Sequence, residues 1–348
     1  MTTPLQALGW DHFFEQQLDE PLQDCCEPAR VMNVERSTWN VAGASGDVAV
    51  SPTDLGDDSA VAVGDWLIID RSAPRAKRRL KRKTLFKRRA PGTDRSEQVI
   101  AANVDTLFIV SSCNQDFNEA RLERYLSIAH DAGVMPIVVL TKSDLADDPG
   151  EYATRASKLA PGLLVETLNA LERSSLEPLD PWLQAGQTIA LLGSSGVGKS
   201  TLTNTLLGDA RLATQSIRED DDKGRHTTTA RQMFSLPGGA WLIDTPGMRE
   251  LQLVDVADGI DDVFAEIALL AEQCRFADCS HDAEPGCAVR SAIDDGAVDE
   301  ARLARWRKLL REEAMNRESI AERRARGKAT GRLYKSILSD SHARKGRS

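Results

Sequence analysis

The sequence lacks any long apolar run. Although 41% of its 348 residues are hydrophobic, no segment approaches the roughly 18 consecutive apolar residues of a membrane-spanning helix. The first residues also lack the basic and then apolar pattern of a secretory signal. We therefore expect a cytoplasmic protein without a membrane partner. We also expect a monomer. Its length is sufficient for two or three domains with hydrophobic cores.

Cysteine is scarce, with six in the chain, and a reducing compartment favours thiols or metal ligands over disulfides. Cys274, Cys279, His281 and Cys287 fall within fourteen residues. Three thiols and an imidazole are enough for a closed tetrahedral zinc site, although the spacing is not that of the common zinc motifs. The alternative, buried free thiols beside an unrelated histidine, fits this clustering less well. The remaining cysteines have no such pattern and are expected to be structural: Cys25, Cys26 and Cys113.

Negative charge dominates, with a formal net charge of −9, but it is unevenly distributed. Residues 71–92 contain eleven Lys and Arg and no acidic residue, whereas residues 301–348 contain fifteen Lys and Arg against five acidic residues. The second zone alone carries +10, which leaves −19 for residues 1–300. The plain alternatives are a solvated loop and a solubilising tail. Because uncompensated cations are costly to hold together without an anion, we expect RNA contact at both zones.

The pattern of apolar residues divides the chain into four parts. Residues 1–28 show no sustained period and are expected to form a loosely held N-terminal extension. Residues 29–95 contain short β-rich runs separated by turn signals, which predict a small closed barrel of the OB type. Residues 96–260 alternate between buried strands and amphipathic helices, which predicts a parallel sheet covered by helices. Residues 261–348 are expected to form a mostly helical zinc domain with a basic tail.

Two of these parts contain apolar residues at informative positions. The basic run after the predicted barrel strand at residues 65–69 is interleaved with Leu80, Leu85 and Phe86. In the C-terminal part, residues 299–317 are predicted to form a helix that packs on the zinc module. Its predicted buried face consists of Leu303, Trp306 and Leu310.

A complete phosphate-binding P-loop occupies residues 193–200. An apolar run at residues 188–192 predicts the strand that should precede it, and residues 200–207 have helical spacing. The loop amides and the helix N-terminus would bind phosphate oxygens, while Lys199 would reach the β- and γ-phosphates and Ser200 would bind Mg²⁺. A plain Gly-rich turn between strand and helix is the alternative. The predicted binding residues are Gly193, Ser194, Ser195, Gly196, Val197, Gly198, Lys199, Ser200 and Thr201.

A second group of motifs completes a nucleotide site. Asp244 ends a predicted strand, where it would hold Mg²⁺, and the Gly247 amide would meet the γ-phosphate. Thr228 would join the Mg²⁺ ligands when the triphosphate is bound. The segment Thr141–Asp144 also follows a predicted strand, and the Asp144 carboxylate would accept both hydrogen bonds of the guanine N1 and N2 donors. The predicted residues of this guanine motif are Thr141, Lys142, Ser143 and Asp144.

The order of these motifs indicates a circularly permuted domain, because the guanine motif precedes the P-loop. At this point the chain resembles the RsgA family of circularly permuted GTPases, also called YjeQ, which act in maturation of the small ribosomal subunit. The resemblance rests on residues 98–105, 224–229 and 244–247 and extends over nearly the whole chain from residue 29. It implies an OB barrel, a permuted GTPase domain and a zinc domain. It also implies GTP, Mg²⁺ and one zinc ion, and a small ribosomal subunit with its 16S rRNA as partner.

The sequence departs from the family pattern in two places, the guanine motif and the next base-contacting loop. Thr141 stands where the family usually has Asn, which we expect to weaken a hydrogen bond between loops. Met248 follows Gly247, so the Gln that orients water in other GTPases is absent. His226 would then orient the attacking water, with Lys199 and Thr228 completing the catalytic set, or it would only brace its loop. A second base-contacting loop is expected near Thr167, without a residue assignment.

Two other functions remain in competition with a GTPase that binds the small ribosomal subunit. The first is a P-loop ATPase or kinase of small-molecule metabolism, which differs in its choice of nucleotide at Asp144. The second is a non-catalytic RNA-binding protein with a vestigial nucleotide site, which would show no turnover with small subunits.

Overall fold

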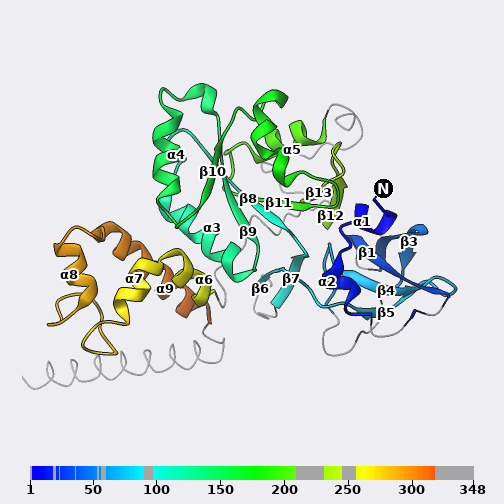
Figure 1. Ribbon diagram of the computed structural model, residues 1–348, viewed down its shortest axis with the longest axis horizontal. Coiled ribbons are helices and arrows are strands. Elements are labelled where there is room, and N and C mark those ends of the chain that lie inside the picture. The colour runs from blue at the N-terminus through cyan, green and yellow to red at the C-terminus, as the bar shows by residue number, and fades with distance from the viewer. Residues whose placement is uncertain are drawn as a thin grey trace, which may run out of the picture.

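The computed structural model shows a central α/β unit with a β-rich N-terminal unit on one side and C-terminal helices on the other (Figure 1). It describes residues 2–18, 21–22, 24–35, 37–52, 55, 60–89, 97–208, 231–244 and 256–317.

The N-terminal unit is built from antiparallel strands. Strand β1 pairs with β2 and with β4, while β2 pairs with β3 and β4 with β5. An isolated bridge between Ser51 and Arg75 links the end of β3 to the start of β5. Val31, Val41 and Leu67 lie in a buried apolar cluster that these strands enclose. The strands are β1 (Cys26–Val34), β2 (Trp39–Gly43), β3 (Gly46–Val50), β4 (Trp66–Asp70) and β5 (Arg75–Arg79).

The N-terminal residues pack firmly on this unit, so the expectation of a loosely held extension is wrong for residues 2–18. They form α1 (Pro4–Ala7) and α2 (His12–Glu15). Phe14 is buried, and the Trp10 ring meets the Trp66 ring edge-on at a centroid distance of 4.8 Å. The Arg30 guanidinium donates a hydrogen bond of 2.6 Å to the Leu8 carbonyl oxygen. Each helix is a single turn, which is too short to produce a recognisable apolar period.

The central sheet contains five parallel strands in the order β10-β9-β8-β11-β13, as the alternating pattern predicted. Strand β12 runs antiparallel to β13 and also pairs with β1, so the sheet continues into the N-terminal unit. Strands β6 and β7 form a separate pair. The strands are β6 (Leu85–Arg89), β7 (Glu97–Ala102), β8 (Thr106–Ser112), β9 (Met135–Thr141), β10 (Leu164–Thr167), β11 (Thr188–Leu192), β12 (Arg231–Ser235) and β13 (Trp241–Asp244).

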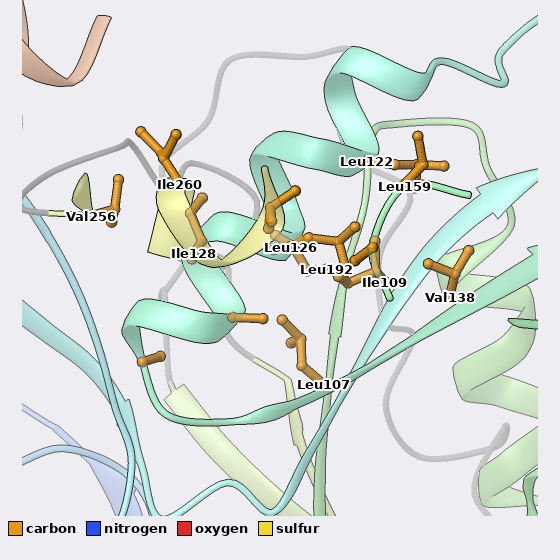
Figure 2. Packing of buried hydrophobic residues seen from close by; sticks show 14 of the residues in the cluster. Leu107, Ile109, Leu122, Leu126, Ile128, Val138, Leu159, Leu192, Val256 and Ile260 are labelled. Atoms are coloured by element: carbon orange, nitrogen blue, oxygen red, sulfur yellow. The ribbon is translucent and has the colours of Figure 1, made fainter. Parts of the chain in front are cut away.

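Helices cover both faces of the sheet. Because side chains alternate along a strand, Leu107 and Ile109 of β8 face one apolar cluster, while Phe108 and Val110 face the other. Figure 2 shows the first cluster, where side chains of α3 meet strand residues and Ile260 of α6. The helical elements of the central unit are α3 (Glu119–Asp131), η1 (Ser143–Leu145), α4 (Pro149–Ser157), η2 (Arg173–Trp182) and α5 (Lys199–Leu207).

The C-terminal helices share the first apolar cluster with the sheet. Helix α6 lies against α3, and a Cβ at Gly259 would overlap the Ser127 carbonyl oxygen, so the two helices approach closely. The helix predicted at residues 299–317 is confirmed, with Leu303 and Trp306 buried and Leu310 half-buried. Among the described residues, no helix combines the length and apolar character needed to cross a membrane. The elements are α6 (Ala257–Val263), α7 (Ala265–Ala271), α8 (Ala288–Asp294) and α9 (Glu300–Arg317).

Candidate nucleotide-binding site and Cys₃His cluster

The predicted nucleotide motifs meet at one edge of the sheet. Thr141 ends β9, Gly193 follows β11, and Asp244 ends β13. The parallel register aligns these ends, since Ser112 of β8 pairs with Thr141 and Ala190 of β11 pairs with Ile243. Ligands of open α/β sheets bind at the carboxyl ends of the strands. The structure therefore brings together the P-loop, the start of the guanine motif and the aspartate assigned to magnesium.

The P-loop has the backbone shape that phosphate binding requires. Gly196 and Gly198 have φ values of 81° and 93°, which residues with a Cβ rarely adopt. At Gly193 a Cβ would overlap the Val110 carbonyl oxygen. Helix α5 begins at Lys199 with Gly198 as its N-cap and without a side-chain hydrogen bond to its first amides. Those amides can therefore donate hydrogen bonds to an anion, which the positive end of the helix dipole would also attract.

Two cationic side chains hold Ser194 of this loop. The Lys199 ammonium donates to the Ser194 carbonyl oxygen, and the Arg121 guanidinium donates to the Ser194 hydroxyl oxygen at 2.9 Å. Arg121 lies in the first turn of α3, far from the P-loop in sequence. No local motif marks it, so it could not be recognised from the sequence.

Thr141 connects the guanine motif to the P-loop. Its side chain is fully buried, and its hydroxyl oxygen lies 2.6 Å from the Val197 carbonyl oxygen and 3.1 Å from that of Ser111. The hydroxyl has one proton, so the shorter contact defines the donated bond. A hydrogen bond between the guanine motif and the P-loop is therefore present with threonine at this position.

The rest of the guanine motif lies at the surface beside a second loop. Lys142 has a left-handed backbone, and Asp144 is exposed on η1. The Ser143 amide donates to the Leu168 carbonyl oxygen at 3.4 Å, and the Thr205 hydroxyl of α5 donates to the Ala170 carbonyl oxygen at 2.6 Å. Residues 167–170 thus lie between the guanine motif and the P-loop helix, where a second base-contacting loop was expected.

The predicted metal ligands also come together. Cys274, Cys279, His281 and Cys287 place one donor atom each within 4.8 Å of one another. The His281 Nδ1 atom lies 3.5 Å from the sulfurs of both Cys274 and Cys287, which are 3.9 Å apart. A tetrahedral zinc site with bonds of about 2.3 Å to sulfur has edges of about 3.8 Å. The donor set and its dimensions therefore fit zinc.

A model of the RsgA GTPase family matches residues 79–254. The chain belongs to the RsgA GTPase family. "Small ribosomal subunit biogenesis GTPase RsgA 2" of Vibrio parahaemolyticus is 47% identical over 99% of this chain and 95% of its own length. "Small ribosomal subunit biogenesis GTPase RsgA" of Mesorhizobium japonicum is 49% identical over 90% of each chain.

Two solved structures share the fold of this RsgA-family chain. YjeQ from Thermotoga maritima superposes with a TM-score of 0.61 at 23% identity, over 83% of this chain and 99% of its own. YloQ, described as a circularly permuted GTPase, gives a TM-score of 0.57 at 20% identity, over 86% and 99%. The permuted order is visible in the chain itself, since the strand of the guanine motif, β9, precedes the P-loop strand, β11.

Several predicted site residues of the RsgA-family chain lie outside the described residues. These are His226, Thr228 and Gly247. Asp244 is the last described residue of its strand and is half-buried.

Part of the positive charge of the basic zone at residues 71–92 is balanced by carboxylates, which its local sequence did not show. In the part of this zone that the structure describes, at least four cations have carboxylate partners, so the premise that all lack one is wrong. The partners come from other parts of the chain and were invisible in the local sequence. Leu80 and Phe86 in this zone are buried and belong to the cores. The ion pairs are Arg71 with Glu27, Lys77 with Asp70, Arg82 with Asp65, and Lys83 with Asp11.

Cys25 and Cys26 lie close to each other and to a carboxylate, which their sequence positions did not predict. Their sulfurs lie 3.7 Å apart, and both are close to the Asp70 carboxylate. The Lys77 ammonium lies 3.1 Å from that carboxylate and already balances its charge, so we do not interpret the group as a metal site. Cys113 is buried, and burial raises the pKa of its thiol to about 11. That environment fits the structural role predicted for Cys113.

Proposed function

We propose that this chain is a GTP hydrolase that binds the small ribosomal subunit and assists its late maturation. The contact between Thr141 and Val197 carries this proposal, because it holds the guanine motif against the P-loop so that one nucleotide can reach both. The names of the full-length relatives, which are small ribosomal subunit biogenesis GTPases, supply the partner. Their coverage of nearly the whole chain favours the same role over a metabolic ATPase.

The described residues suggest how the site would work on GTP. The α5 amides and Lys199 would bind the β- and γ-phosphates, and Arg121 and Lys199 would keep Ser194 in place. Asp144, exposed at the surface of η1, would accept the two guanine donors that adenine lacks. Residues 167–170 would contact the base from its other side. Hydrolysis would depend on a water molecule oriented by His226, or by another group if His226 only braces its loop.

The residues also fit the two metals that the family implies. Hydroxyl and carboxylate oxygens are the ligands that Mg²⁺ prefers, and Ser200, Asp244 and Thr228 would supply them. When bound, Mg²⁺ would neutralise charge that develops on the phosphates. Zinc would be held by the Cys₃His cluster and would stabilise the C-terminal fold.

The flanking parts would provide the RNA contacts. We propose that β1 to β5 form the OB-type barrel of residues 29–95, on the basis of their antiparallel pairing and the bridge between Ser51 and Arg75. The basic residues that follow, with those of the C-terminal tail, would bind the 16S rRNA backbone. The GTPase domain would span residues 96–260 and the zinc domain residues 261–348, in a monomer.

A turnover assay tests the proposal. Purified protein should hydrolyse GTP faster when small ribosomal subunits are added, and excess ATP should not compete. Asp144→Asn should weaken GTP binding by orders of magnitude without changing the unfolding midpoint, because a charged acceptor of the guanine edge is lost. Asp147→Asn, on a neighbouring exposed residue, provides the control. Equal binding of ATP and GTP, or no response to small subunits, would contradict the proposal.

A further inference from the structure

Helix α3 contacts the P-loop through Arg121 and the C-terminal helix α9 through its charged residues Glu119, Glu123 and Arg124. Arg121 donates to the Ser194 hydroxyl oxygen at 2.9 Å. Glu123, two residues later, accepts hydrogen bonds from Arg302 at 2.9 Å and from Arg305 at 2.7 Å. Residues two apart on an α-helix are separated by about 200° around its axis. The two contacts therefore leave α3 on nearly opposite sides.

The contact with α9 is a buried ion cluster. The Glu123 side chain is fully buried, and this burial raises its pKa, although hydrogen bonding and charge from Arg305 and the charge of Arg302 act in the opposite direction. Arg302 also donates to the carbonyl oxygens of Val263 and Leu159, at 2.9 Å and 3.0 Å. Removing one partner of such a cluster leaves an uncompensated buried charge, which is strongly unfavourable. The position of α9 on α3 is thus tightly specified.

Trp306, the residue after Arg305 on α9, contacts the predicted metal cluster. The Trp306 ring lies 5.7 Å from the His281 ring, measured between centroids. Trp306 is buried, and the clusters of α3, α6 and α9 form one continuous apolar core. Figure 1 shows α9 and α6 beside α3 on the side of the sheet away from α5. Adjacent residues of α9 therefore contact a predicted metal ligand and the buried carboxylate of α3.

We propose that Arg121 is a positioning residue for the P-loop and that α3 transmits the docking of α9 to it. Arg121 fixes the Ser194 side chain and adds positive charge beside the phosphate-binding loop, while Lys199 fixes the carbonyl oxygen of the same residue. A displacement of α9 would move Glu123 and, through the rigid helix, Arg121. The inference rests on the proposed function, in that it describes how the C-terminal domain acts on that nucleotide site.

A double-mutant cycle tests this coupling, because spatial adjacency alone does not establish it. Arg121→Met removes the charge that contacts the P-loop, and Arg305→Met removes a charge of α9 that contacts Glu123 of α3. Dissociation of bound nucleotide is measured for each variant and for the pair. We expect each change to accelerate dissociation by about two- to thirtyfold. In the double variant, dissociation should be no faster than with Arg121→Met alone. Arg121→Lys should recover part of the loss, since it restores the charge.

Arg311→Met provides the matched control, because this arginine is exposed on the same helix. It should leave dissociation unchanged. Zinc retention and unfolding midpoints are measured for each variant, and Arg305→Gln, which removes the charge but keeps a hydrogen-bond donor, replaces Arg305→Met if that variant unfolds. Additive effects, or an Arg305 variant that behaves like Arg311→Met, would overturn the inference. The cycle uses whichever nucleotide the unaltered protein holds most tightly, so a preference for ATP would contradict the proposed function alone.

Discussion

The Thr141 hydroxyl donates a hydrogen bond of 2.6 Å to the Val197 carbonyl oxygen and so joins the guanine motif to the P-loop. The side chain is fully buried between β9 and the loop, and a Cβ at Gly198 would lie 3.1 Å from its hydroxyl oxygen. Two segments that are more than fifty residues apart thereby share one hydrogen bond and one close packing contact. In the proposed site, the relative position of base and phosphates would depend on this junction.

Thr141→Val should test the junction, since valine has the shape of threonine without the hydroxyl. The Val197 carbonyl would lose a partner in a buried setting, at a cost of about 0.5–1.5 kcal/mol. We expect GTP and GDP affinities to fall by about two- to tenfold, measured by calorimetry. Thr141→Ser keeps the hydroxyl and should bind nearly as the unaltered protein does. Unchanged affinity of the valine variant would show that the loops are held together by other contacts.

The sequence predicted the parts of this site whose chemistry depends on local residue types. The P-loop needs glycines, a lysine and a hydroxyl at fixed spacing, and the metal cluster needs thiols and an imidazole close together, so both were recognisable. Arg121 and Glu123 act on residues more than seventy positions away, and no local pattern encodes such contacts. The buried position of Phe14 was missed for a related reason, because tertiary packing, and not periodicity, orders the one-turn helices.

Acid should destabilise the N-terminal unit through Asp70. Hydrogen bonds from Ser72 and from Lys77 lower the pKa of this carboxyl below its usual value. A carboxylate with a lowered folded pKa stabilises the fold above its unfolded pKa, near 3.9, and this contribution is lost as the pH falls toward the folded value. Urea unfolding of the unaltered protein should therefore lose more stability between about pH 5 and pH 2 than unfolding of Asp70→Asn. Asp47→Asn, which alters an exposed residue of β3, serves as the control substitution, and identical slopes for all three proteins would refute the assignment.

Zinc should co-purify at one ion per chain, and Cys279→Ala should abolish its retention. Because a structural zinc contributes folding free energy directly, the C-terminal helices should become sensitive to proteolysis first. Nucleotide binding by the P-loop should persist, weakened only as far as α3 transmits the change. Cys25→Ser, which alters a half-buried thiol outside the cluster, should keep both zinc and protease resistance. If metal analysis detects no zinc in protein that was prepared without chelators, this prediction is wrong.

His226→Ala should leave GTP binding and small-subunit docking nearly unchanged while sharply reducing subunit-stimulated hydrolysis. Lys199, Ser200 and Asp244 are assigned to phosphates and metal and therefore to affinity, whereas Met248 cannot orient water as a glutamine would. His226 is two residues from Thr228, in a segment expected to order over the γ-phosphate. A water-orienting or general-base group contributes roughly 10²–10⁴-fold, so the loss should be large and confined to kcat.

Stopped-flow measurement of phosphate release with saturating small subunits isolates this step from nucleotide binding. His12→Ala, which removes an exposed imidazole of α2, controls for histidine loss elsewhere and should hydrolyse GTP at the unaltered rate. If stimulated turnover of His226→Ala stays within about a factor of two of the unaltered protein, the imidazole only braces its loop, because loss of a catalytic group is not that mild. The water would then have to be oriented by another group, and the backbone amides near Gly247 would be the next residues to test.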